Sequence, residues 1–128
     1  MIATLSAAQI EYLAGQRLGR LATIRPDGSP QNNPVGFRYN EALGTIDIAG
    51  HNMGASQKFR NLTKEARVAF VVDDIASVNP WQVRCLEIRG VAQALRDVET
   101  YLEGGSRELI RITPQRVLGF GIDQAGID

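Results

Sequence analysis

The chain has 128 residues, and its 14 basic and 14 acidic side chains leave no net charge at neutral pH. A balanced chain has no overall field that would attract nucleic acid or an acidic membrane surface, and it contains no basic run with interleaved aromatic residues. Apolar residues make up 44% of the chain and charged residues 22%, as is typical of globular proteins. The length predicts a single domain, 1–128.

The composition also argues against several kinds of site and location. The N-terminus lacks a basic start followed by an apolar core, and no apolar run is long enough to span a bilayer. The only cysteine, Cys85, excludes an internal disulfide and fits a reducing compartment. Because the chain has one histidine and no Cys/His cluster, we expect no metal site. We therefore expect a cytoplasmic protein with neither a nucleic-acid nor a membrane partner.

The first predicted element is a helix that begins after Ser6. Ser6 and Gln9 have the spacing of a capping box, and Leu5 can pack against Ile10 as a hydrophobic staple. The periodicity then changes to that of strands separated by Gly-, Pro- and Asn-containing turns. We expect a three-stranded antiparallel meander with short connections, its strands covering residues 19–25, 31–39 and 45–49.

The next segment, 49–62, has the pattern of a strand end, a turn of small residues and a helix start. A helix start offers backbone N–H groups that lack intrahelical acceptors, and the Ser56 hydroxyl and the Lys58 and Arg60 cations lie beside it. Such a junction favours an anion, most often a phosphate. The spacing is that of neither a P-loop nor a dinucleotide-binding turn. A solvated helix face is the alternative interpretation of the two cations.

The second half of the chain adds further strands. We expect an apolar strand buried on both faces, a loop, a long strand, a short helix and a final pair of strands separated by Pro114; these cover 67–72, 73–80, 83–95, 97–103, 109–113 and 116–122. Six or so strands with short turns predict a mainly β (α+β) fold. Its architecture would be a closed or partly closed antiparallel barrel with short helices at the rim.

Three segments in this order resemble a known family. Arg20-Leu-Ala-Thr-Ile-Arg-Pro-Asp-Gly-Ser-Pro-Gln31, followed by Asn33-Pro34-Val35, is similar to the first hairpin of the pyridoxamine 5′-phosphate oxidase-like split β-barrel flavoproteins. Ser56-Gln57-Lys58 with Asn61-Leu62 resembles the start of their phosphate-binding helix. Arg111 to Val117, ending in Phe120-Gly121, resembles their C-terminal strand pair. The resemblance implies a six-stranded antiparallel split β-barrel of the FMN-binding type.

Within that family, the opening Leu-Ala-Thr-Ile-Arg-Pro-Asp-Gly resembles the branch that binds the deazaflavin coenzyme F420, with FMN as the alternative cofactor. The resemblance implies a homodimer with the cofactor between its subunits. It also implies the residues that contact the cofactor: Ser56, Gln57, Lys58 and Asn61 at the phosphate; Thr23, Ile24, Asn33, Pro34 and Val35 at the ring; the backbone of Ile48, Ala49 and Gly50 along the ribityl chain; and Trp81 reaching across from the partner.

The implied activity is hydride transfer from reduced coenzyme F420 to a small organic acceptor, with no indispensable catalytic side chain. A pyridoxamine phosphate oxidase-type reaction with FMN and a carrier that binds a flavin or deazaflavin without turnover are the alternatives. Some residues have a second interpretation. His51 can hydrogen-bond in a polar turn rather than act in acid–base catalysis, and Trp81 can pack in the dimer rather than on the ring. Asn32 and Asn33 can satisfy turn backbone groups or place an amide near a flavin carbonyl.

Overall fold

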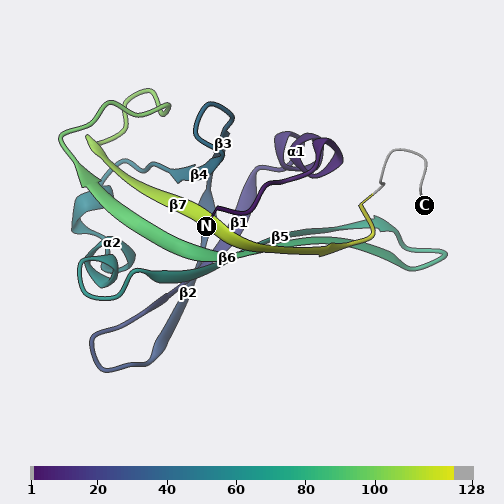
Figure 1. The fold of residues 1–128 in the computed structure, drawn as a ribbon, viewed down its shortest axis with the longest axis horizontal. Helices are drawn as coiled ribbons and strands as arrows, with labels where there is room; N and C mark the ends of the chain where they lie inside the picture. Colours follow the sequence, from purple (N-terminus) through teal and green to yellow (C-terminus); the bar gives the residue numbers. More distant parts are fainter. Residues whose placement is uncertain (1, 123–128) are drawn as a thin grey trace.

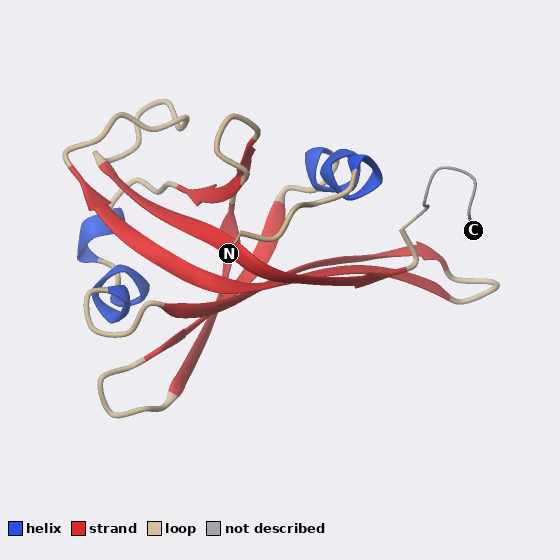
Figure 2. Ribbon diagram, in the orientation of Figure 1, coloured by secondary structure: helices blue, strands red, loops and turns tan. Residues whose placement is uncertain are grey.

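The protein folds around one antiparallel sheet of seven strands, in the order β2-β1-β5-β6-β7-β4-β3. The structure is a computed structural model that describes residues 2–122. Figures 1 and 2 show the long central strands curving past the two hairpins and the helices lying at the periphery of the sheet. The elements are α1 (Ala7–Ala14), β1 (Leu18–Ile24), β2 (Pro30–Gly36), β3 (Arg38–Asn40), β4 (Thr45–Ile48), η1 (Met53–Ala55), α2 (Gln57–Leu62), β5 (Arg67–Ser77), β6 (Gln82–Arg96) and β7 (Glu108–Phe120).

The sheet is split rather than closed. β2 and β3 follow each other in the chain with only Phe37 between them, yet they lie at opposite edges of the sheet. The ring of Phe37 meets that of Phe70 edge to face, with centroids 5.2 Å apart. The split-barrel fold class is therefore confirmed, with seven strands rather than six. The strand expected over 31–39 is divided at Phe37 into β2 and β3.

The predicted meander is wrong. β1 pairs with β2 and β3 pairs with β4, but β1 continues the sheet through β5, and β4 continues it through β7. The two hairpins are thus separated by the long strands. This strand order depends on pairing between segments that are distant in the chain. Turn residues predict which neighbouring strands form a hairpin, but not which distant strands pair.

Three of the later elements also differ from expectation. Residues 73–77 continue β5 rather than forming a loop, and β5 alternates buried and more exposed residues instead of being buried on both faces. The two final strands are one, β7, because Pro114 lies at a bulge opposite Gly90. A Cβ atom at Gly90 would lie 2.1 Å from the Thr113 carbonyl oxygen, so only glycine allows this close approach.

No helix forms over 97–103. Asp97 has a φ of +57°, a left-handed conformation that interrupts a right-handed helix at its first residue. The segment instead turns back on itself, and the Val98 N–H donates to the Arg107 carbonyl. Residues 97–107 therefore form a loop between β6 and β7 (Figure 1), and Ser106 near its end accepts a hydrogen bond from the Met53 N–H of η1.

The predicted first helix is confirmed with its cap. The Ser6 hydroxyl accepts a hydrogen bond from the Gln9 backbone, and the Gln9 side chain accepts one from the Ser6 backbone. Leu5 is buried, and Ile10 packs against the same apolar core. This core fills the concave side of the sheet, where Ile46, Phe59, Phe70 and Ile112 lose all exposure to solvent. No helix within residues 2–122 has the length and apolar character needed to cross a membrane.

Candidate functional site

A pocket of about 190 Å³ lies in the split of the sheet. One wall is the edge strand β2, and the other is the end of β4 with the turn that follows it, while α2 contributes Lys58. Two prolines, Pro30 and Pro34, occupy the edge strand, where a missing N–H breaks no ladder. The lining residues are Pro34, Val35, Gly36, Ile48, Ala49, Gly50, His51, Asn52, Met53 and Lys58. The structure thus brings together six residues that the sequence placed in a cofactor site, contributed by three separate elements.

Lys58 is the cation of this pocket. Its side chain is half-buried, and within residues 2–122 no carboxylate forms an ion pair with it. Burial lowers the pKa of Lys58, because desolvation disfavours the charged form of an ammonium group. A half-buried cation without a counter-ion is suited to an anionic ligand.

The backbone donors of the junction are largely occupied, contrary to the sequence-based expectation. The Met53 N–H donates to the Ser106 hydroxyl at 2.9 Å, and the Gly54 N–H donates to the Glu108 carboxylate at 3.0 Å. The Ser56 hydroxyl caps α2 by accepting from the Phe59 N–H, and it donates to the Met53 carbonyl. The N–H groups that still lack an intrahelical acceptor belong to the first helical residues, Gln57 and Lys58.

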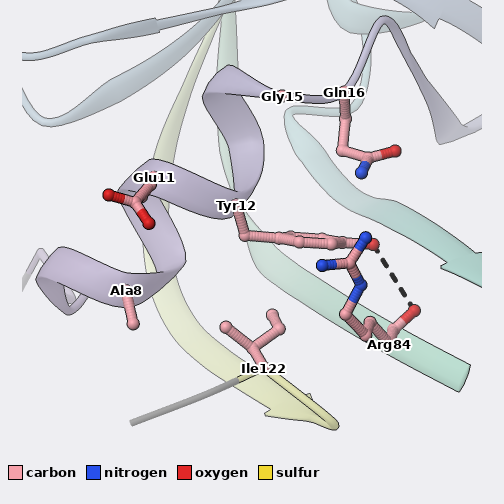
Figure 3. Close-up of a pocket in the computed structure, with 7 residues that line it drawn as sticks. All are labelled: Ala8, Glu11, Tyr12, Gly15, Gln16, Arg84 and Ile122. Carbon is pink, nitrogen blue, oxygen red and sulfur yellow. Dashed lines mark hydrogen bonds between the residues drawn. The ribbon is translucent and has the colours of Figure 1, made fainter. Parts of the chain in front are cut away.

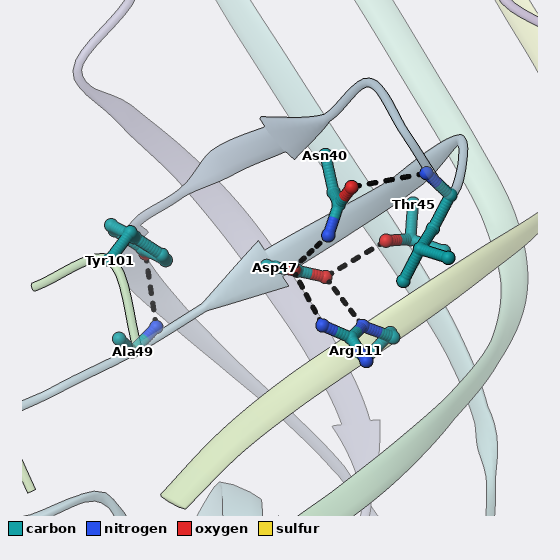
Figure 4. Close-up of polar contacts among 7 residues, drawn as sticks. Asn40, Thr45, Asp47, Ala49, Tyr101 and Arg111 are labelled. Carbon is teal, nitrogen blue, oxygen red and sulfur yellow. Dashed lines mark hydrogen bonds and ion pairs between the residues drawn. The ribbon is translucent and has the colours of Figure 1, made fainter. Parts of the chain in front are cut away.

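The loop 97–107 holds the pocket wall in place. The Tyr101 hydroxyl accepts from the Ala49 N–H at 3.0 Å (Figure 4). The Ser106 backbone and hydroxyl both donate to the Gly50 carbonyl, at 2.8 and 3.1 Å. His51 is exposed, and its Nδ1 lies 3.3 Å from the Gly104 carbonyl. Sequence reasoning assigned neither Ser106 nor Tyr101 to the site, and it placed Tyr101 in a helix over 97–103 that does not form.

A buried ion pair supports β4 directly upstream of this wall. Asp47 is 5% exposed and accepts two hydrogen bonds from Arg111 of β7, each 3.1 Å long. Thr45 and Asn40 donate to the same carboxylate (Figure 4). Every carboxylate oxygen thus has donors, which is the condition under which a buried charge is tolerated. The network fixes β4 against β7 and, through it, the position of Ile48 and Ala49.

A second polar network joins α2 to the first hairpin. Asn61 is fully buried, and its side-chain amide contacts Thr23 of β1, Gln31 of β2 and Gln57 of α2. Gln31 in turn donates to Asn33. Thr23 and Asn61 therefore hold elements together, whereas Gln31 and Gln57 line a second pocket of about 520 Å³ with Arg25, Pro26 and Asp27. Ile24 is half-buried at the end of β1, beside these residues.

Trp81 does not reach the pocket of its own chain. It lies in the turn between β5 and β6, which Figure 1 shows at the opposite end of the molecule from α2. Its side chain is 64% exposed and lies beside an open hollow of about 660 Å³ to which Phe120 also contributes. Ile75, Val78 and Phe120 are likewise exposed on this projecting end, which we call the arm (Ile75, Val78, Trp81 and Phe120).

A further hollow, of about 250 Å³, lies between α1 and β6 (Figure 3). Arg84 stacks on the ring of Tyr12 at 4.9 Å and pairs with Asp74, which also accepts from Tyr12 and Gln16. The guanidinium lowers the pKa of Asp74, and burial raises that of Tyr12. Arg84 and Asp74 thus neutralise each other and are already engaged within the fold. Within residues 2–122 no cluster of metal-ligating side chains occurs.

The model of the family described as pyridoxamine 5′-phosphate oxidase matches residues 5–121. The chain belongs to this family. Its relatives include the 5a,11a-dehydrotetracycline/5a,11a-dehydrooxytetracycline reductase of Streptomyces rimosus subsp. rimosus. That protein is 46% identical over 119 residues, which are 90% of this chain and 82% of the reductase. Such a relative supports an oxidoreductase.

Solved structures of similar fold include an F420 reductase, with a TM-score of 0.61 and 25% identity over 80% of this chain and 89% of that one. A FAD-binding protein from Mesorhizobium loti has a TM-score of 0.66 and 20% identity over 93% and 96% of the two chains. The pocket of this pyridoxamine 5′-phosphate oxidase-family member has a donor set that fits a flavin-type cofactor. Lys58 suits a phosphate, while Val35 and Ile48, which are almost fully buried, form part of the pocket wall.

Proposed function

We propose that this protein is an F420-dependent reductase that adds hydride to a carbon–carbon double bond of a polycyclic acceptor of the dehydrotetracycline class. The observation that carries the cofactor part is the half-buried Lys58, which lines a pocket in the split of the sheet and forms no ion pair with a carboxylate of residues 2–122. The reductase of Streptomyces rimosus supports the acceptor class, and the F420 reductase supports the cofactor. FMN is the alternative cofactor, and the FAD-binding relative favours a flavin of that kind.

We assign each end of the pocket a part of the cofactor. Lys58 and the N–H groups of Gln57 and Lys58 would bind phosphate, since the Lys58 side chain lines the pocket and these two N–H groups have no intrahelical acceptor. Gly50 and Ala49 would let the ribityl chain approach the backbone closely. The backbone of Ile48 would lie along the ribityl chain with them, and Val35 would lie beside the ring, with Asn33 and Pro34 along the edge strand β2.

When bound, reduced coenzyme F420 supplies a hydride, and the acceptor gains that hydride and one proton while the coenzyme becomes oxidised. The residues of β2 and of the end of β4 would hold the ring and would limit the access of water to it. No acid or base within the described lining of the pocket is placed as a required proton donor, since His51 is exposed and turned to the Gly104 carbonyl. The proton would then come from solvent, and binding residues alone would account for the activity.

The pocket in one chain is small for such a ligand. Sites for drug-sized molecules enclose roughly 300–1,000 Å³, whereas this pocket encloses about 190 Å³. A homodimer that completes the site from a second subunit resolves the difference. The arm supports this proposal, because Trp81 and Val78 expose 64% and 73% of their surfaces, and exposed apolar patches mark interaction sites. The partner's arm would then cover the ring. We also propose a cytoplasmic location, since the single cysteine of the chain suits a reducing compartment.

Paired titrations of the purified protein with coenzyme F420 and FMN test the cofactor, and oxidation of reduced F420 in the presence of 5a,11a-dehydrotetracycline tests the reaction. Tight F420 binding with turnover of the acceptor supports the proposal. Preference for FMN would move the protein to the flavin-dependent alternative. Tight F420 binding without turnover of this or related acceptors would favour a carrier. Sedimentation of wild type and Trp81→Ala tests the dimer, which we expect the substitution to weaken.

A further inference from the structure

A chain of side-chain hydrogen bonds runs from the surface of α2 to the edge strand β2. Arg60 donates to Gln57 Oε1 at 2.8 Å, and Gln57 Nε2 donates to Asn61 Oδ1 at 2.7 Å. Asn61 Nδ2 donates to Gln31 Oε1 at 3.0 Å, and Gln31 Nε2 donates to Asn33 Oδ1 at 2.7 Å. Four amides are thus linked head to tail between a cation and the split of the sheet.

The direction of this chain is set at one end. An amide has one accepting and one donating side, so rotating all four amides by half a turn would leave each internal link intact. A guanidinium, however, can only donate. Rotating the amides would place the Gln57 Nε2 donor against the Arg60 donor, so Arg60 requires Gln57 to present its Oε1. The orientation of Gln57 then determines that of Asn61, which determines that of Gln31, which determines that of Asn33.

The consequence falls on Asn33, the last member. Its Oδ1 is occupied by Gln31, and no acceptor within residues 2–122 takes its Nδ2. Gln31, Asn33 and Val35 alternate along β2 and therefore share one face. Gln31 lines the larger pocket and Val35 the smaller, so Asn33 lies on the strand between them.

We propose that Arg60 is a positioning residue whose charge makes Asn33 a hydrogen-bond donor toward the split, and that Asn33 thereby selects a ligand with an oxygen acceptor there. This inference rests on the proposed function, in which the ligand is a flavin or deazaflavin ring that carries carbonyl oxygens. A ring that presented an N–H at that position would meet a second donor and bind poorly. Asn61 connects the two ends, which gives a fully buried amide a role in this core.

Solvent exchange of side-chain NH2 groups, measured by NMR on the ligand-free protein, tests the direction. In wild type we expect the Gln31 and Asn61 NH2 groups to exchange slowly and that of Asn33 to exchange fast. In Gln31→Glu the new carboxylate still accepts from Asn61, but it forces Asn33 to turn and donate to it, so the Asn33 NH2 becomes protected. A protected Asn33 NH2 in wild type would overturn the proposal. Arg60→Leu should loosen the pattern, and Arg60→Lys, which remains a donor, should preserve it.

Cofactor affinity tests the selection. In Gln31→Glu the Asn33 carbonyl should face a ligand carbonyl. F420 or FMN binding should then weaken by roughly 10- to 100-fold, because an unpaired polar contact costs about 1–3 kcal/mol. Asn32→Asp is the matched control, since it adds the same charge on the same strand but on the opposite, exposed face. Equal affinities of Gln31→Glu and wild type would overturn the selection. A wild type that binds neither cofactor would instead refute the proposed function, and the amide exchange would still decide the direction of the chain.

Discussion

Replacing Lys58 by methionine removes the charge of the pocket while keeping an unbranched side chain of similar length. In the structure the ammonium group is half-buried, lines the pocket in the split and has no carboxylate partner within residues 2–122. The variant should therefore lose cofactor affinity without losing stability, because no ion pair of the fold is broken. Lys58→Ala should behave in the same way.

The magnitude follows from Coulomb's law at a contact distance. Two unit charges about 4 Å apart interact by roughly 1 kcal/mol in water and roughly 4 kcal/mol at an effective dielectric constant of about 20. Half burial places Lys58 between these limits, so we expect a loss of about 2–3 kcal/mol, or roughly 30- to 150-fold in Kd. Added salt should reduce the difference between wild type and variant, because it screens a partly exposed pair.

Fluorescence titration with coenzyme F420 measures the loss, and thermal unfolding of the ligand-free proteins measures stability. Lys64→Met is the matched control, since Lys64 is an exposed lysine just beyond α2. An F420 affinity of Lys58→Met equal to that of the control would refute the assignment of Lys58 to the phosphate. A large fall in the melting temperature of Lys58→Met would show instead that the lysine supports the fold.

Three other outcomes are expected. Cofactor affinity should fall as pH rises through the lowered pKa of Lys58, because the ammonium group loses its charge. Over the same pH interval the ligand-free protein should gain stability, because the unfolded chain holds more protons than the folded chain. Cofactor titrations and unfolding experiments at several pH values, with Lys58→Met for comparison, measure both changes. His51→Ala should keep kcat/KM within roughly twofold, and a loss of turnover with cofactor still bound would contradict this. Asp47→Ala should lower the free energy of unfolding by about 3 kcal/mol or more, because Arg111 loses its buried partner, as denaturant unfolding would show.

Local signals predicted the parts of the fold that depend on neighbouring residues. The capping box of Ser6 and Gln9 is formed as expected, since both partners lie within one helical turn. The predictions of a meander and of a helix after residue 96 were wrong, because these regions depend on contacts between residues far apart in the chain. β4 pairs with β7, more than sixty residues away, and Tyr101 is drawn from helical geometry toward Ala49. A pattern of apolar residues contains no information about such partners.

The candidate site divides in the same way. Lys58, Gly50 and Val35 come from segments with recognisable patterns, and the structure brings them to one pocket. Ser106 lies 53 residues from Met53 in the chain, and no motif connects them. The role of Asn61 was also hidden, because an amide beside a phosphate-like motif predicts a ligand contact, whereas the structure buries it among Thr23, Gln31 and Gln57.

The bulge at Gly90 and Pro114 lies near the middle of the two longest strands, well away from the pocket in sequence. The pocket walls, β2 and β4, belong to opposite sides of the sheet and are joined through all the strands between them. A bulge increases the local twist and bend of its strand. The width of the pocket therefore depends on the curvature of the whole sheet. A substitution at Gly90 would change that width by changing the curvature, although Gly90 contacts no lining residue of the pocket.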